Sequence, residues 1–98
     1  MEKAVAIEKL KQRADAMKRM GATTLYMFGS TARDEASALS DLDLFIDHDP
    51  AKRFSLFDLV GIKQFLEEEL SVSVDVTTRT SLHPMLKGDI EQSAIRIF

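Results

Sequence analysis

Residues 28–47 read FGSTARDEASALSDLDLFID and set the first limits on the fold. The stretch opens with the pair Gly29–Ser30, runs through small and polar residues, and ends in a segment that alternates apolar and acidic positions. A period of two predicts a strand with one apolar face, formed by Leu42, Leu44 and Ile46, and one acidic face. Asp41 and Asp43 lie on the acidic face, roughly 7 Å apart along the strand. Two carboxylates placed in this way repel each other unless a positive group lies between them.

The flanking segments predict alternating helices and strands. Apolar spacing of three and four residues predicts a helix over residues 2 to about 20, which ends at Gly21. Further strands are expected at Thr23–Phe28 and Ser71–Val76, a helix from the capping pair Ser55 and Asp58, a helix from Pro84 to about Gln92, and a short extended segment at the end. This order predicts an α/β (α+β) fold, a short mixed sheet with helices on one face.

A third carboxylate belongs with the first two. In the strand expected at 71–76, Val72, Val74 and Val76 share one face, and Asp75 lies on the other. If this strand pairs beside the acidic one, Asp75 lies close to Asp41 and Asp43. Oxygen ligands without His or Cys favour a hard divalent cation, Mg²⁺ or Mn²⁺, of the kind that serves phosphoryl or nucleotidyl transfer.

The Gly29–Ser30 pair is the second candidate feature. Glycine allows a ligand to approach the backbone, and Ser30 offers a hydroxyl and an amide where a helical turn begins, which suits an anion. A Gly-Ser pair alone is usually only a turn, and an Asp-x-Asp alone is often solvated. We interpret Asp47 and Asp49, a second such pair, as loop surface. The combination of features favours a site at Asp41, Asp43 and Asp75.

The composition limits the class of protein. The chain has 98 residues, 45% of them hydrophobic, and a formal net charge of −3, so we expect one domain over residues 1–98. An acidic balance argues against a sequence-tolerant nucleic-acid binder. The absence of cysteine excludes disulfides and thiolate metal sites. The charged N-terminus is unlike a signal peptide, and no apolar run is long enough for a bilayer, so we expect a cytoplasmic protein without membrane contact.

The motif GSTAR followed by SDLDL resembles the nucleotidyltransferase superfamily typified by DNA polymerase β. It is most similar to the minimal nucleotidyltransferases (MNT), including the MntA-type antitoxins of HEPN–MNT toxin–antitoxin pairs. The likeness covers nearly the whole chain. It implies that Gly29 and Ser30 hold the terminal phosphates of a nucleoside triphosphate. Arg33 would either contact a phosphate as part of the same binding site or form a structural ion pair. At Asp34 the related pattern usually has glycine, so this chain carries an extra negative charge there.

The resemblance also implies an activity. Asp41, Asp43 and Asp75 would bind two metal ions, Mg²⁺ or alternatively Mn²⁺, with ATP as substrate. AMP would pass to a hydroxyl, expected on a tyrosine, of a partner HEPN toxin by in-line attack, and pyrophosphate would leave. Two alternatives remain: an antitoxin that neutralises its partner by binding alone, and a catalytic subunit that acts on another acceptor. Assembly into a homo- or hetero-oligomer stays open, as do roles for Arg79, His83 and Lys87.

Overall fold

Four strands form one mixed sheet in the order β3-β2-β1-β4. The computed structural model describes residues 2–33 and 41–98. Along the chain its elements are α1 Lys3–Gln12, α2 Ala14–Arg19, β1 Ala22–Phe28, α3 Gly29–Ala32, β2 Leu42–His48, α4 Leu56–Leu70, β3 Val74–Thr78, the 3₁₀ turn η1 Arg79–Ser81, α5 Pro84–Ser93 and β4 Ile95–Arg96. β1 is antiparallel to β2 and to β4, whereas β2 and β3 run parallel.

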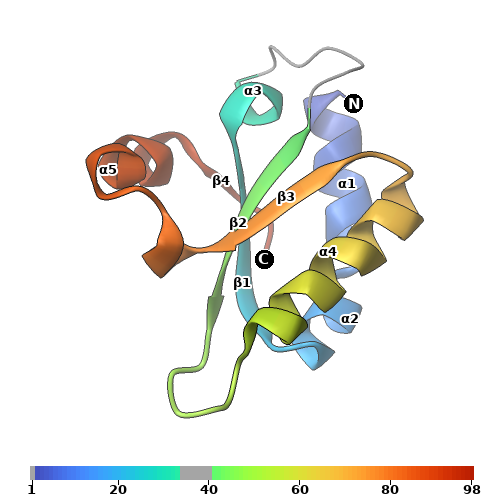
Figure 1. Cartoon of the computed structure of the whole chain (residues 1–98). Helices are drawn as coiled ribbons and strands as arrows, with labels where there is room; N and C mark the ends of the chain where they lie inside the picture. Colours follow the sequence, from blue (N-terminus) through green and yellow to red (C-terminus); the bar gives the residue numbers. More distant parts are fainter. Residues whose placement is uncertain (1, 34–40) are drawn as a thin grey trace.

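Helix α4 makes the crossover that the parallel pair β2 and β3 requires. It starts as the sequence predicts, because Ser55 and Asp58 form a reciprocal capping box. Helices α1, α2 and α4 lie on the same side of the sheet (Figure 1). Their apolar side chains and one face of the sheet make up the core, whose members include Leu10, Met17, Leu25, Leu42, Leu44, Ile46, Ile62, Leu66 and Val74.

The opposite side of the sheet is partly covered as well. Helix α5 lies on that side, away from α1 and α4 (Figure 1). Phe45, whose side chain alternates with the core residues of β2, is fully buried. Its ring stacks on Tyr26 with centroids 4.8 Å apart. The predicted helical layer on one face therefore holds for three helices, while α5 adds cover at one end of the other face.

The helix predicted over residues 2 to about 20 is interrupted at Arg13. The Arg13 backbone leaves helical geometry, with φ −106° and ψ 10°, and its guanidinium donates a hydrogen bond to the Lys9 carbonyl. The same side chain lies 3.7 Å from a carboxylate oxygen of Glu69 on α4. An uninterrupted helix was therefore the wrong expectation, because a side chain replaces part of the backbone ladder.

The third strand begins three residues later than the sequence predicts. Ser71 ends α4 in the left-handed conformation, with φ 56° and ψ 35°, so the chain turns before it can extend. The strand starts at Val74 and continues to Thr78. Asp75 keeps its place on the face opposite the buried Val74 and Val76. Within the residues described, none of the helices has both the length and the apolar character needed to cross a membrane.

We predict that Leu66→Ala lowers the free energy of unfolding by about 2–5 kcal/mol, the range for emptying a packed core site. Leu66 has no exposed surface and lies in the middle of α4. Urea unfolding followed by circular dichroism measures the loss. The control, Glu68→Ala, changes an exposed position of the same helix and should stay within about 0.5 kcal/mol of the parent. Equal losses in both variants would contradict the assignment of the core face.

Candidate active site

The acidic residues meet at one end of the sheet face that points away from α4. On the central strand β2, Asp43 is the register partner of Phe28 on β1 and of Asp75 on β3. Neighbouring strands lie about 4.8 Å apart, so Asp43 and Asp75 are immediate neighbours. Asp41 is exposed and lies one residue before β2 begins. The register thus brings Asp43 and Asp75 together as the sequence predicted, with Asp41 at the entrance of the strand.

The charges around Asp43 are mostly of its own sign. Burial raises the pKa of Asp43 above its ordinary value, and the carboxylates of Asp75 and Asp41 raise it further. Arg33 acts in the opposite direction and lowers the same pKa. The negative charge of the group is therefore incompletely compensated by the protein, which is the property that a cation site requires.

Gly29 follows β1 directly and lies against Asp43. Its φ of +75° belongs to the left-handed region that favours glycine. A Cβ atom added there would overlap the Oδ2 atom of Asp43 and lie 3.2 Å from its Cγ. The sequence predicted Gly29 for close approach of a ligand. The structure shows a second reason for glycine, because the carboxylate of Asp43 occupies the space that a side chain would fill.

The Gly-Ser turn forms the short helix α3 at the same end of the sheet. Ser30 is half-buried within this turn. The Arg33 N–H donates to the Gly29 carbonyl at 3.2 Å, which closes the turn, and the Arg33 side chain is exposed. All three residues of the predicted phosphate site thus lie beside the acidic end. Asp34, where the sequence departs from the related pattern, lies outside the described residues.

The aspartates do not form a ready-made metal cage. Among residues 2–33 and 41–98, no three side chains of His, Cys, Asp or Glu are grouped closely enough to hold a metal ion. The donor set nevertheless fits a hard divalent cation, because it consists of carboxylates alone and because Asp75 and Asp41 both act on the charge of Asp43. The metal-binding roles of Asp41, Asp43 and Asp75 therefore remain a prediction.

Two side chains of α4 fix the strand that carries Asp75. Lys63 donates from Nζ to the Val74 carbonyl at 2.7 Å, and Glu67 accepts from the Val74 N–H at 3.1 Å. The two residues are themselves 3.6 Å apart as an ion pair. The sequence does not predict this contact, because helical spacing shows only that Lys63 and Glu67 lie off the apolar face. They hold the backbone one residue before Asp75.

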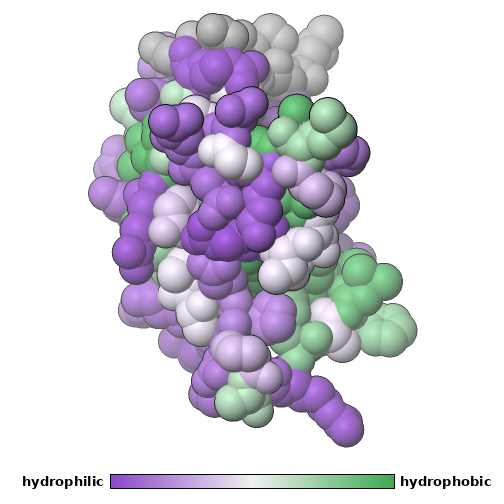
Figure 2. All heavy atoms as spheres, turned by 90° about the vertical axis from the view of Figure 1, so that its left-hand side faces the viewer, coloured by the Kyte–Doolittle hydropathy of each residue, from purple (hydrophilic) through white to green (hydrophobic). Residues whose placement is uncertain are grey.

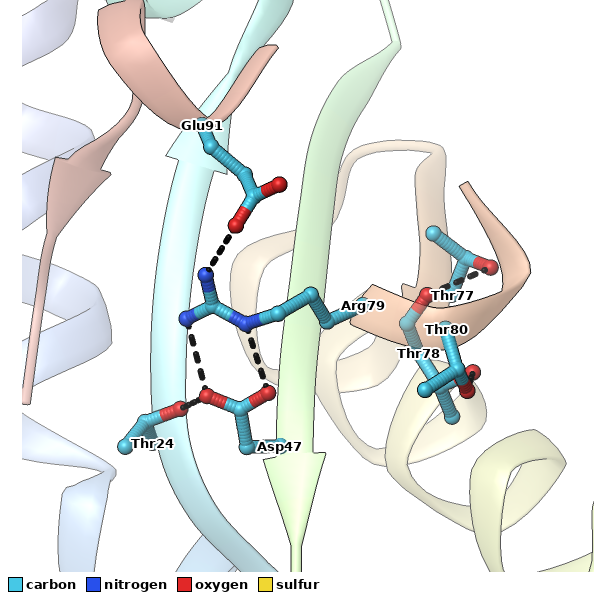
Figure 3. A network of polar contacts seen from close by, with 7 residues as sticks. All are labelled: Thr24, Asp47, Thr77, Thr78, Arg79, Thr80 and Glu91. Carbon is cyan, nitrogen blue, oxygen red and sulfur yellow. Dashed lines mark hydrogen bonds and ion pairs between the residues drawn. The ribbon is translucent and has the colours of Figure 1, made fainter. Parts of the chain in front are cut away.

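Arg79 is a further residue to which the sequence assigned no role (Figure 3). Its guanidinium makes two hydrogen bonds to Asp47, of 2.8 and 2.9 Å, and one of 2.7 Å to Glu91 on α5. It lies 4.9 Å from the ring centroid of Tyr26 and 5.0 Å from that of Phe45. The interpretation of Asp47 as loop surface was wrong, because Asp47 lies in β2 and is paired. Its position two residues after Phe45 was the available signal.

His83 has a local role. Its side chain accepts a hydrogen bond from the Met85 N–H at 3.2 Å and so caps α5, whose first residue is Pro84. This confirms the expectation of a short helix that begins at the proline.

Comparison with known proteins agrees with this geometry. A family model described as a nucleotidyltransferase domain matches residues 7–97. The chain belongs to the nucleotidyltransferase family. A protein of Methanocaldococcus jannaschii, provisionally named a protein adenylyltransferase, is 44% identical over 71 residues, which are 72% of this chain and 74% of the relative. The protein adenylyltransferase MntA of Thermococcus cleftensis is 31% identical over 78 residues, 80% of this chain and 73% of the relative.

Solved structures place this nucleotidyltransferase among the minimal members of the family. A structure provisionally described as a minimal nucleotidyltransferase superposes with a TM-score of 0.75 at 34% identity, covering 97% of this chain and 95% of the other. A toxin–antitoxin complex with AMP-PNP has a TM-score of 0.72 at 18% identity, with coverages of 90% and 72%. A Shewanella oneidensis complex of a tri-AMPylated HEPN toxin with an MNT antitoxin has a TM-score of 0.64 at 15% identity, with coverages of 90% and 68%. At these lower identities the likeness shows the fold.

We predict that Gly29→Ala lowers both the transferase rate and the stability. The added methyl group would displace the Asp43 carboxylate and would hold alanine at a φ that it rarely adopts. Gly88→Ala is the matched control, because a Cβ there meets nothing within 4 Å and alanine favours a helix interior. Thermal melts and nucleotide-transfer assays measure both effects. Wild-type activity in Gly29→Ala would contradict the close packing of Gly29 on Asp43.

We predict a pH-dependent loss of stability in Asp47→Asn. Hydrogen bonds from Arg79 hold the pKa of Asp47 below its ordinary value. The stabilisation is therefore present above the unfolded-state pKa of about 3.9 and is lost as the pH falls through the lower folded-state pKa. Because the pair is partly exposed, the loss near neutral pH should be on the order of 1 kcal/mol.

Urea unfolding of both proteins between pH 7 and pH 2.5 tests the role of the Asp47 carboxylate. The difference between parent and variant should shrink at the acid end. A difference that stays constant over this range would show that the charge of Asp47 does not stabilise the fold. Arg79→Lys, which keeps the positive charge but loses the two-pronged geometry, should also destabilise the protein near neutral pH.

Proposed function

We propose that this nucleotidyltransferase is the antitoxin of a HEPN–MNT pair and transfers AMP from ATP to a hydroxyl, expected on a tyrosine, of its partner HEPN toxin. The observation that carries the proposal is the pairing of Asp43 with Asp75 beside the Gly29 turn. Support for the protein acceptor comes from relatives named as protein adenylyltransferases. Support for the HEPN partner comes from the solved complex of a tri-AMPylated HEPN toxin with an MNT antitoxin. The matched chain of that complex shares the fold of this chain.

The residues of the site have distinct roles in this reaction. Asp43 and Asp75, with Asp41 at the edge, would hold two divalent cations, in the first place Mg²⁺. When bound, the ions would lower the pKa of the attacking hydroxyl and neutralise charge on the leaving pyrophosphate. Gly29 and Ser30 would bind the terminal phosphates through backbone N–H groups and the serine hydroxyl. The exposed positive charge of Arg33 lies close enough to act on Asp43 and would face the same phosphates.

The chemical step is a substitution at the α-phosphorus of ATP. The bond from the acceptor oxygen to this phosphorus forms as the bond from phosphorus to the β-phosphate oxygen breaks. Asp75, which is exposed at the edge of the site, would receive the proton of the attacking hydroxyl. Pyrophosphate leaves with the bonding electrons. The partner toxin gains an AMP group through a phosphodiester linkage, and no oxidant or reductant is needed.

We predict that Asp43→Asn lowers label transfer by about 10²-fold or more while partner binding persists. Loss of metal-assisted charge stabilisation is worth several kcal/mol, and each 1.36 kcal/mol is tenfold in rate. The protein is mixed with Mg²⁺, α-labelled ATP and the HEPN-type protein encoded beside it, and label on the partner is followed over time. Asp41→Asn and Asp75→Asn should behave similarly. The matched control is Asp15→Asn, the same chemical change at an exposed position of α2.

Three results would overturn the proposal. Near-parental turnover by Asp43→Asn would remove the acidic end from the reaction. Absence of label with the parent protein, while both proteins still bind tightly, would favour an antitoxin that acts by binding alone. Label on another molecule, with none on the HEPN-type protein, would favour a catalytic subunit with a different acceptor.

A further inference from the structure

The first two turns of α4 carry a large apolar surface that the fold leaves in water. Leu56 is 73% exposed, Phe57 88% and Val60 41%. Val60 follows Phe57 by three positions and Leu56 by four, so the three side chains are neighbours on the helix surface. We call them the α4 patch. Figure 2 shows a group of hydrophobic atoms at the lower right of a face that is otherwise mostly hydrophilic.

The hydrophobic core does not include these three side chains. The core contacts of α4 come from other positions, including the buried Ile62, Leu66 and Leu70. The first turn is held by the capping box, in which the Ser55 N–H donates to Asp58 at 2.7 Å. Single exposed apolar residues are common, whereas a contiguous group rimmed by polar residues marks an interaction site.

Basic residues border the α4 patch. Lys52 and Arg53 are exposed and lie in the turn directly before α4. With Lys18 and His48 they line a hollow of 150 Å³, whose one acidic residue, Asp49, accepts the Ala51 N–H. A surface with apolar side chains beside an excess of positive charge is complementary to a protein segment that presents an apolar side chain flanked by carboxylates.

The two parts of this surface meet at one pair of rings. The rings of His48 and Phe54 stack with centroids 4.7 Å apart. Both residues also line a second hollow, of 200 Å³, together with Leu56 and Leu59. The two hollows therefore share a wall. A partner's apolar side chain seated beside Leu56 would bring its neighbouring carboxylates toward Lys52 and Arg53.

The surface lies apart from the acidic end of the sheet. His48 ends β2, and Asp43 lies near its beginning, so the two residues are separated by about 17 Å of strand. A typical protein interface covers about 800 Å² on each partner, which is wide enough to include both regions of a molecule whose extents are 37 × 31 × 19 Å. A partner that docks on α4 and extends past the edge strand β3 would reach Asp43 and Asp75 on the other face of the sheet.

We propose that the α4 patch, with Lys52 and Arg53, is the docking surface for the protein that receives AMP. The partner contributes an apolar side chain flanked by carboxylates. This inference rests on the proposed function for the identity of the acceptor. Contacts away from the acidic end would help to bind the protein acceptor without changing the chemical step at Asp43.

The test compares Phe57→Ser and Leu56→Ser with the parent protein. Calorimetric titration with the HEPN-type protein encoded beside this chain gives the Kd, and label transfer from α-labelled ATP gives KM and kcat for that partner. The Kd and KM should each rise at least tenfold, with kcat at saturating partner unchanged. Because Phe57 is 88% exposed, the melting temperature should stay the same. Unchanged Kd and KM would overturn the proposal.

Met85→Ser is the matched control, since Met85 is 84% exposed on α5. A larger loss of partner binding in Met85→Ser than in Phe57→Ser would move the docking surface to α5 and overturn the proposal. Sedimentation of the chain alone is the second control. If the parent sediments as a dimer and Phe57→Ser as a monomer, the α4 patch joins two copies of this chain and the proposal is wrong.

Lys52→Glu combined with Arg53→Glu tests the chemistry of the partner. Binding should weaken at least tenfold, and the Kd of the double variant should depend less on salt concentration than the Kd of the parent does. Unchanged binding would overturn the acidic character of the partner segment. Failure of the proposed function gives a different result. If Phe57→Ser loses partner binding but the parent protein puts no label on the partner, docking is supported and AMP transfer is rejected.

Discussion

The two-pronged ion pair between Asp47 and Arg79 allows an acidic strand to lie in the middle of the sheet. β2 carries Asp43 and Asp47 on one face, and the fold treats them in opposite ways. Arg79 compensates Asp47 and holds its pKa low, whereas burial and neighbouring carboxylates hold the pKa of Asp43 high. The guanidinium also covers the rings of Tyr26 and Phe45 and reaches Glu91 on α5. One end of this face is therefore closed and neutralised, and the other stays acidic and open.

The acidic end reduces stability, and the rest of the fold offsets this. A carboxylate with a raised pKa is less stable in the folded protein than in water, in proportion to the shift. The compensation comes from the other side of the sheet, where α4 buries Ile62, Leu66 and Leu70 against it. Such an arrangement is common for active sites, which retain strained or repulsive groups on a stable scaffold. Gly29 belongs to the same arrangement, because its missing side chain is what admits the Asp43 carboxylate.

Features that depend on neighbouring residues in the sequence could be predicted from it. The strand period of β2 identified Leu42, Leu44 and Ile46 as core residues, and the spacing of Ser55 and Asp58 gave the start of α4. The pairing of Asp43 with Asp75 followed once the two strands were assumed to be adjacent. The metal and phosphate roles of these residues came from the motif and stay predictions.

Features that depend on distant partners could not be predicted. Arg79 and Asp47 are 32 positions apart, so their pairing is a consequence of the β2–β3 register and of the turn η1. The interruption at Arg13 reflects its reach to Lys9 and Glu69.

The hydrogen bonds of Lys63 and Glu67 to the Val74 backbone connect the core to the acidic end. β3 is an edge strand of the sheet, so its outer backbone groups need partners other than a neighbouring strand. Lys63 and Glu67 satisfy the carbonyl and the N–H of Val74 from α4, the helix whose adjacent face packs into the core. Movement of α4 against the sheet would therefore move the backbone next to Asp75.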